Sequence, residues 1–353
     1  MEPSINHVGM LSMFTHPVFQ VVDGLIVAVN RQAADLQIKE NTPVFDILES
    51  AKDEYRDFTG GTMSLSVKAG DVRFVAAVVK CDQSDIFHIL TGSENNELQA
   101  LALAAQHLRE PLCNVIALTD TMLTLDDNPK PKNKLYSAQL NQNLHKLMRT
   151  IGNMSDTGVC ANRTSGMQTQ NITALINDAL LHTKDLLGQN HQLLVKPCND
   201  NINGLADDTL LERAVYNMIS NAIRYSPEGS TVTASVQHSK AKVILTVENE
   251  CPNFSPEQMG TLFFRYRRTP SVTEGNTGLG LGIPLIQAVA AAHRGSLLFT
   301  LPEPGKVRFC LTIPVRTGSG TNLRSPILRP DYAGGYDHRL IELADILPSE
   351  RYE

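Results

Sequence analysis

Two short segments hold residues whose types and spacing could bind a phosphorylated ligand. The first, residues 217–227, places Asn217 and Asn221 four positions apart, so both amides lie on one face of a helix. The second, residues 275–282, has glycine at alternate positions from Gly278 onwards, directly before an apolar stretch. Glycine lets backbone N–H groups approach phosphate oxygens closely, and a helix N-terminus adds favourable charge. The pattern therefore favours polyphosphate binding.

A third segment, residues 262–268, lies between these two and reads Leu-Phe-Phe-Arg-Tyr-Arg-Arg. In this order the three segments resemble the N-box, the aromatic box and the second glycine box of the ATP-binding domain of sensor histidine kinases. The resemblance implies a Bergerat fold, an α/β sandwich that holds ATP between helices and a mobile lid, here residues 269–277. The nucleotide-binding residues that it implies are Asn217, Asn221, Arg224, Tyr225, Asn249, Thr277, Gly278, Leu279, Gly280 and Gly282.

The resemblance also implies how the nucleotide would be held. Mg²⁺ is a hard cation that takes oxygen ligands, usually few from the protein and the rest from phosphates and water. By the family pattern Asn221 would supply the metal-binding oxygen, Arg224 would face a phosphate and Tyr225 would line the pocket. The implied cofactors are ATP and Mg²⁺.

The family's first glycine box, Asp-x-Gly-x-Gly after a strand, is altered here to residues 249–253. Asn249 stands where the family has an aspartate that accepts a hydrogen bond from the adenine amino group. A neutral amide still accepts, but charge-assisted bonds are roughly twice as strong. Cys251 and Asn253 replace two glycines and restrict the backbone. These changes predict weakened or lost nucleotide binding.

The phospho-acceptor motif of the family, His-[Glu/Asp]-Leu-x-x-Pro-Leu, is also altered. The matching residues 106–112 read Gln-His-Leu-Arg-Glu-Pro-Leu, so Gln106 stands at the acceptor position and His107 follows it. One residue turns a helical side chain by about 100°, so His107 does not simply inherit the role. Our candidate for the phosphorylated residue is His107, and His145 on the next helix is a weaker one.

The chain reads as an α+β multi-domain protein of four segments. They are a PAS-like sensor domain (1–93), a dimerisation helical hairpin (94–160), a histidine-kinase-like ATPase domain (161–316) and a C-terminal tail (317–353). In the ATPase domain we expect helices at 172–188, 207–225 and 283–293, and strands at 192–195, 231–237, 242–248, 296–301 and 307–313.

The first segment predicts strands at 19–22, 25–29, 62–67, 72–80 and 86–90, with a helix at 31–38. Asp23 and Gly24 between the first two strands signal a tight hairpin. Residues 22–34 are similar to the start of PAS sensor domains, which implies a sensory role and names no ligand.

Helices at 94–126 and 133–155 each carry one apolar stripe. Two antiparallel helices bury such stripes poorly alone, so we expect a homodimer with a four-helix bundle, the alternative being a hairpin inside a monomer core. In the tail, Asp337 could cap a last helix with an apolar face from Leu340 to Leu347, which docks on its own domain or on a partner.

Composition limits the remaining classes. A net charge of −6 argues against nucleic-acid binding. No apolar run reaches the ~18 residues of a membrane span, and no signal peptide is evident. The six scattered cysteines fit reduced thiols, so we expect a cytoplasmic protein.

Three hypotheses remain. The first is a sensor histidine kinase that autophosphorylates and passes phosphate to the receiver domain of a response regulator. The second is a pseudokinase of the same fold, a dimeric nucleotide- or partner-binding regulator, favoured by Gln106 and the altered first glycine box. The third, a serine/threonine kinase of the anti-sigma type, is disfavoured by the 94–155 hairpin.

Overall fold

The computed structural model describes residues 11–81, 84–90, 112–113, 115–116, 119–120, 131–159, 167–188, 191–254, 259, 262–264, 282–317 and 335–353. Several predicted site residues lie outside these ranges, namely Gln106, His107, Thr277, Gly278, Leu279 and Gly280. Most of the predicted helix at 94–126 and the predicted lid do so as well.

The N-terminal part is an antiparallel sheet whose strands follow the order β2-β1-β5-β4-β3. Its strands are β1 (Val18–Val22), β2 (Leu25–Val29), β3 (Thr62–Ala69), β4 (Val72–Cys81) and β5 (Ser84–Leu90), and the helices α2 (Arg31–Asp35), α3 (Val44–Ile47) and α4 (Lys52–Arg56) connect β2 to β3. The predicted hairpin is present, since Asp23 (φ 49°) and Gly24 (φ 78°) both take the left-handed conformation of a two-residue turn.

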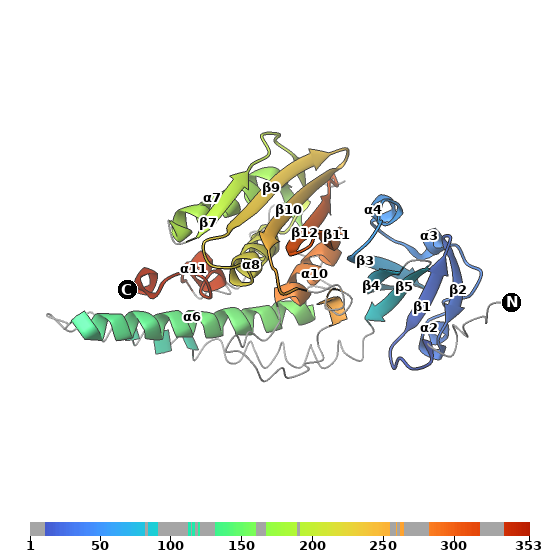
Figure 1. The fold of residues 1–353 in the computed structure, drawn as a ribbon, viewed down its shortest axis with the longest axis horizontal. Helices are drawn as coiled ribbons and strands as arrows, with labels where there is room; N and C mark the ends of the chain where they lie inside the picture. Colours follow the sequence, from blue (N-terminus) through green and yellow to red (C-terminus); the bar gives the residue numbers. More distant parts are fainter. Residues whose placement is uncertain are drawn as a thin grey trace.

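A second group of strands follows the order β11-β12-β10-β9-β7, in which only the pair β7 and β9 is parallel. The strands are β7 (Gln192–Lys196), β9 (Thr231–Ser239), β10 (Lys242–Glu250), β11 (Ser296–Glu303) and β12 (Lys306–Pro314). Helices α7 (Ile172–Leu187), α8 (Asp208–Arg224) and α10 (Gly282–Ala292) share one apolar core with them (Figure 1). A short pair, β6 (Gln168–Asn171) and β8 (Asn203–Ala206), lies beside them.

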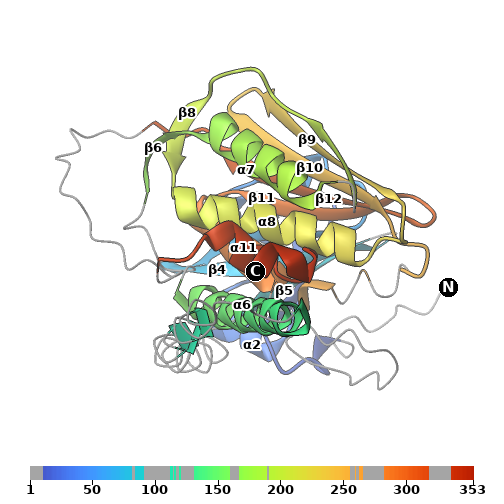
Figure 2. The same cartoon turned by 90° about the vertical axis from the view of Figure 1, so that its left-hand side faces the viewer.

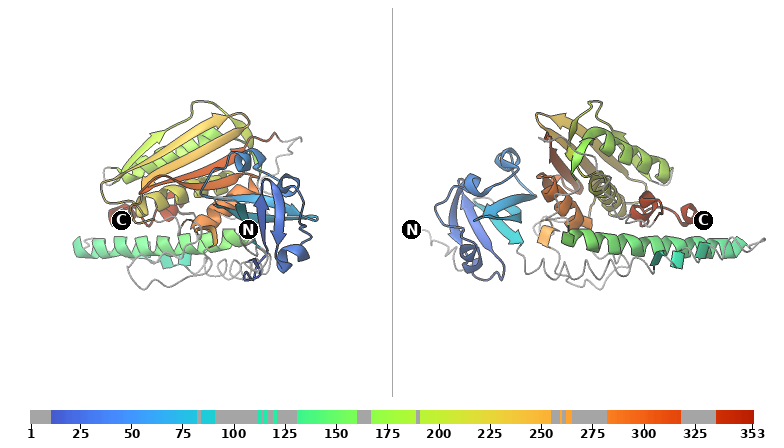
Figure 3. Two further views of the ribbon diagram at one scale, coloured as in Figure 1. Left: turned by 45° about the vertical axis from the view of Figure 1, so that its right-hand side comes forward. Right: turned by 180° about the vertical axis from the view of Figure 1, so that it is seen from behind.

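The two groups of strands join into one ten-stranded sheet, which the sequence did not predict. Edge strand β3 pairs antiparallel with β11, from Ser64 opposite Leu297 to Thr62 opposite Phe299. The ammonium of Lys242 on β10 lies 2.9 Å from the carboxylate of Glu54 on α4 and adds an ion pair across the junction. Figure 3 shows the N-terminal strands at one end of the molecule and the C-terminus at the other.

A long helix, α6 (Pro131–Val159), runs beneath the second group (Figure 1). Between α6 and α8 lies the C-terminal segment, which we define as residues 335–353 and which holds α11 (His338–Glu342) and the 3-10 helix η3 (Ser349–Tyr352). Figure 2 shows the resulting order α6, α11, α8, α7. Asp337 caps α11 as predicted, accepting a hydrogen bond from the Arg339 N–H. Of the two docking options for the tail, the structure therefore shows the intramolecular one.

The predicted strands and the helices at 172–188, 207–225 and 283–293 agree with the structure to within a few residues. The sequence missed α3, α4, β6 and β8, which are four or five residues long and too short for a periodic pattern. In the described ranges no helix is both long and apolar enough to cross a bilayer.

Candidate functional site

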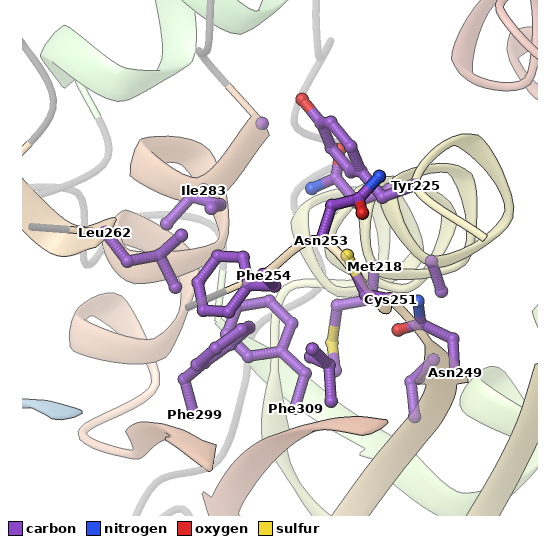
Figure 4. Close-up of a pocket in the computed structure, with 15 residues that line it drawn as sticks. Met218, Tyr225, Asn249, Cys251, Asn253, Phe254, Leu262, Ile283, Phe299 and Phe309 are labelled. Carbon is purple, nitrogen blue, oxygen red and sulfur yellow. The ribbon is translucent and has the colours of Figure 1, made fainter. Parts of the chain in front are cut away.

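A cavity of about 340 Å³ opens between α8, α10 and strands β10–β12 (Figure 4). Its volume falls within the roughly 300–1,000 Å³ typical of small-molecule sites. Apolar side chains dominate its lining, and the polar groups come from one edge of α8 and the end of β10. The lining residues are Met218, Asn221, Ala222, Tyr225, Val247, Asn249, Cys251, Asn253, Phe254, Leu262, Gly282, Ile283, Phe299, Val307 and Phe309.

Helix α8 carries the N-box residues toward the first turn of α10. Asp207 caps α8 by accepting from the Leu210 N–H. A Cβ added to Gly282 would lie 3.2 Å from both Asn217 Oδ1 and Asn221 Nδ2. Glycine at this position thus lets both amides meet the start of α10. The predicted shared face of the two asparagines is present, and Gly282 lies against it.

Asn221 lines the cavity, whereas Asn217 lies behind it and is fully buried. The oxygen of Asn217 accepts from Arg149 Nη2 at 3.0 Å and from Asn153 Nδ2 at 3.4 Å. Its Nδ2 donates to the Arg213 carbonyl at 2.9 Å and to Glu342 Oε2 at 3.0 Å. Every strong hydrogen-bonding position of this amide is therefore taken by the protein itself.

Asn249 ends the buried run of β10 at the cavity edge, with 9% of its surface exposed. Its Nδ2 donates to Ser226 Oγ at 3.2 Å and to the Glu250 carbonyl at 3.0 Å. These bonds fix the amide orientation, and Figure 4 shows its oxygen toward the other lining side chains. The arrangement leaves an acceptor for an amino group on a ligand.

Cys251 and Asn253 line the cavity where the family has glycines. Neither takes a positive φ, so the backbone here does not require glycine. Burial raises the pKa of the Cys251 thiol, which keeps it neutral and makes it a small apolar wall. The altered glycine box therefore narrows the cavity with side chains without straining the chain.

Arg224 and Tyr225 end α8 on the side of the C-terminal segment. The Tyr225 ring lines the cavity and is 57% exposed. The Arg224 guanidinium lies 5.8 Å from the centre of that ring and 3.7 Å from an Asp345 oxygen. Arg224 is thus within reach of the cavity mouth and is paired with a carboxylate of the C-terminal segment.

Sequence reasoning missed the buried charges around Asn217. Arg213 is 1% exposed and donates from Nε to Glu342, which is itself fully buried. Arg149 on α6 bonds to Asp345 at 2.5 Å. A signal was present for Arg213, which lies one turn before Asn217 on the same helix face. None was present for Glu342, which falls on the opposite side of the predicted tail helix from its apolar face at Leu340, Leu343, Ala344 and Leu347.

The side chains that line the cavity include one, that of Asn221, whose oxygen could bind Mg²⁺ at the start of α10. Asn221 offers an amide oxygen beside the N-terminus of α10, and Mg²⁺ commonly takes one or two protein groups together with phosphates and water. Within the described part of the chain no group of three His, Cys, Asp or Glu side chains could hold a metal ion by itself.

Comparison with known proteins agrees with this geometry. Residues 206–317 match the family of histidine kinase-, DNA gyrase B- and HSP90-like ATPases. The sensor histidine kinase CusS of Escherichia coli strain K12 is 28% identical over 222 residues, which are 60% of this chain and 44% of CusS. The adaptive-response sensory kinase SasA of Crocosphaera subtropica is 26% identical over 271 residues, 71% of this chain and 69% of SasA. The chain spans less than half the length of CusS.

Two solved structures are also similar. Full-length ShkA in complex with AMPPNP aligns with 63% of this chain and 46% of its own at 18% identity and a TM-score of 0.47. The histidine kinase ThkA in complex with the response regulator protein TrrA aligns with 85% of this chain and 96% of its own at 17% identity and a TM-score of 0.40. On the match of residues 206–317, the chain carries a histidine kinase-, DNA gyrase B- and HSP90-like ATPase domain, and its sequence is similar to that of sensor histidine kinases.

Proposed function

We propose that this protein is an ATP-dependent sensor histidine kinase that passes phosphate to the receiver domain of a response regulator. The observation that carries the proposal is the cavity between α8 and α10, where Asn221 lies beside the first turn of α10. All residues that line this cavity fall within residues 206–317, which match the ATPase family. The sequence similarity to sensor histidine kinases supports the reaction class.

In this proposal the apolar lining holds the base and the start of α10 receives the phosphates. Asn249 accepts from the adenine amino group, with its orientation fixed by Ser226. Asn221 supplies an oxygen to Mg²⁺, and the N-terminus of α10 adds favourable charge for anions. Phosphoryl transfer depends chiefly on positioning and electrostatic stabilisation, which these groups supply without covalent chemistry.

The N-terminal sheet is proposed to be the sensory input, a PAS-like domain. Its antiparallel order β2-β1-β5-β4-β3, with three short helices between β2 and β3, supports this reading. The pairing of β3 with β11 gives the input a direct route to the ATPase strands. We propose that a signal altering the N-terminal sheet changes the position of the ATPase domain through this junction.

The proposed homodimer forms through segment 94–160. Leu140 and Leu147 on α6 are 48% and 51% exposed and lie seven positions apart on one face. Leu144, from the same predicted stripe, is instead buried against Ile341 of the C-terminal segment. A second copy covering the Leu140–Leu147 face would bury these side chains in a helical bundle.

The test is the intact mass of full-length protein after incubation with Mg·ATP, kept at alkaline pH to preserve phosphohistidine. A kinase gains one phosphoryl group, which is lost in mild acid and maps to His107, and Asn221→Ala removes the gain. A Gln139→Ala variant serves as a control, because Gln139 is exposed on α6.

The second candidate is a pseudokinase of the same fold. Gln106 at the usual acceptor position and the side chains of Cys251 and Asn253 in the cavity favour it. A pseudokinase adds no phosphate to itself, whether or not it binds nucleotide. His107→Ala then leaves signalling in the host cell unchanged. Loss of signalling by a folded His107→Ala protein contradicts this candidate.

A further inference from the structure

The C-terminal segment brings two carboxylates to the face of α8 that points toward the start of α10. Glu342 lies within 3.0 Å of the Asn217 amide and pairs with Arg213, and Asp345 pairs with Arg149 and Arg224. Asn217, Asn221 and Arg224 share this face, since they are spaced by four and three residues. The segment thus occupies polar groups that adjoin the cavity.

These carboxylates stand close to the position where a polyphosphate would gather negative charge. Asn221 and Asn217 both contact the position of Gly282, at the N-terminus of α10, which favours an anion. Arg224 lies beside the ring of Tyr225, which lines the cavity, and is paired with Asp345. A triphosphate bound beside the start of α10 would compete with Asp345 for this guanidinium, and the like charges of the two would repel each other.

The same segment fastens α6 to α8. Gln142 of α6 donates from Nε2 to the Leu347 carbonyl at 2.7 Å and to the Ala344 carbonyl at 3.1 Å. Asn141 Nδ2 donates to the Tyr352 carbonyl at 3.1 Å. On the opposite side, Glu342 reaches Arg213 and Asn217 of α8. Without the segment, the described contact between α6 and α8 side chains would consist mainly of the bonds of Arg149 and Asn153.

We propose that residues 335–353 are an autoinhibitory clamp, in which the Asp345 carboxylate competes with the nucleotide phosphates for Arg224 while the segment holds the ATPase domain on α6. The inference rests on the proposed nucleotide-binding function. Release of the clamp frees Arg224 from Asp345 and removes the hydrogen bonds through which the segment joins α6 to α8. Since linkage is reciprocal, nucleotide binding loosens the clamp by the same factor by which the clamp weakens nucleotide binding.

The first experiment measures the clamp without nucleotide, by hydrogen exchange in the full-length protein. Gln142→Ala removes two hydrogen bonds to the segment and touches neither α8 nor the cavity, and Gln139→Ala is the matched change at an exposed site of the same helix. We expect faster exchange of amides 340–352 in Gln142→Ala alone. Equal exchange in the two variants overturns the clamp.

The second experiment measures competition with the nucleotide. Asp345→Asn removes one carboxylate from Arg149 and Arg224, and Glu350→Gln is the matched control, since Glu350 is exposed in the same segment. The probe is a fluorescent, non-hydrolysable ATP analogue with Mg²⁺. We expect Asp345→Asn to bind it about two- to fivefold more tightly, the scale of a partly exposed ion pair, and the analogue to speed exchange at 340–352 in the wild type.

Each remaining outcome decides a claim. If the wild type binds the ATP analogue and Asp345→Asn binds it equally or more weakly, the competition is overturned. The segment then has only a structural role, holding α6 against the ATPase domain. No binding by the wild type and clear binding by Asp345→Asn supports a clamp that closes the site fully. No binding by any variant overturns both the proposed nucleotide function and the inhibitory role, while the exchange experiment still reports whether the segment fastens α6.

Discussion

The side-chain amide of Asn217 donates to the carboxylate of Glu342 across 3.0 Å, although 125 residues separate the two along the chain. Both side chains are fully buried. The bond ties the N-box helix to a segment outside residues 206–317, the part that matches the ATPase family. The C-terminal segment therefore packs against the ATPase domain through a buried polar contact as well as through apolar side chains.

Removal of the Glu342 carboxylate should destabilise the protein strongly. Glu342→Ala leaves the buried guanidinium of Arg213 without its carboxylate, and breaking a buried pair from one side costs about 3–5 kcal/mol. Chemical denaturation measures the loss. Glu350→Ala, at an exposed carboxylate of the same segment, should stay within about 0.5 kcal/mol of the wild type. A small effect of Glu342→Ala would show that water enters readily to solvate Arg213.

Gly282→Ala should weaken nucleotide binding more than it weakens the fold. The new Cβ would lie 3.2 Å from an Asn217 oxygen and an Asn221 nitrogen, so at least one amide must move. Asn217 is held by four hydrogen bonds, so we expect Asn221, which lines the cavity, to shift. Titration with a fluorescent ATP analogue and thermal melting separate the two effects.

Gly60→Ala is the control for this change, because a Cβ there meets nothing within 4 Å. If both glycine variants bind nucleotide as the wild type does, the start of α10 is not part of the binding site. If Gly282→Ala melts far below the wild type, the close approach of α8 and α10 serves the fold first.

Much of this architecture could be predicted from local patterns. Period-two and period-3.6 apolar spacing gave the strands and long helices, and Asp23 with Gly24 gave the first hairpin, because these signals arise within a few residues. The pairing of Asn217 and Asn221 on one face likewise follows from helix geometry alone.

The long-range relationships could not be predicted. The pairing of β3 with β11 depends on two strand edges whose side-chain patterns fit many partners. Asn217 is buried because Arg149 of α6 and Glu342 of the C-terminal segment satisfy its side-chain amide. Both residues are far from Asn217 in the sequence, and no local pattern indicates that they meet it. A single sequence shows that Asn217 is polar on an apolar helix but not which groups satisfy it.

The docking of the C-terminal segment should depend on pH through His145 and His338. Burial lowers the pKa of His145, opposed in part by the Asn141 carbonyl and by Asp120. The His145 ring centre lies 5.0 Å from that of Tyr352. Since the unfolded histidine takes a proton more readily, stability falls as pH drops below about 6.5. The hydrogen bond to Glu212 raises the pKa of His338. The stability that protonated His338 contributes is therefore present in acid and is lost as the pH rises through the pKa of the folded state.

Hydrogen exchange of amides 340–352 between pH 5 and 8, corrected for the intrinsic rate, measures this dependence at the segment itself. His145→Gln should flatten the acid side, and His338→Gln should flatten the alkaline side. The local readout is needed because burial also lowers the pKa of His293, whose protonation would destabilise the ATPase core as a whole. An acid response that persists unchanged in His145→Gln would assign it to another group.

The exposed face of α6 gives a direct test of the proposed dimer. Leu147 is 51% exposed and Leu140, two turns earlier, is 48% exposed, so a partner helix would cover both. Leu147→Glu places a charge in that interface and should convert the dimer to a monomer in multi-angle light scattering.

The control is Gln139→Glu, which adds the same charge at another exposed position of α6. The buried side of α6, with Met148 and Leu144 against the protein, is untouched by either change, so helix content should stay constant. If Leu147→Glu remains a dimer, the two copies meet elsewhere, and if the wild type is a monomer, this leucine face serves no self-association.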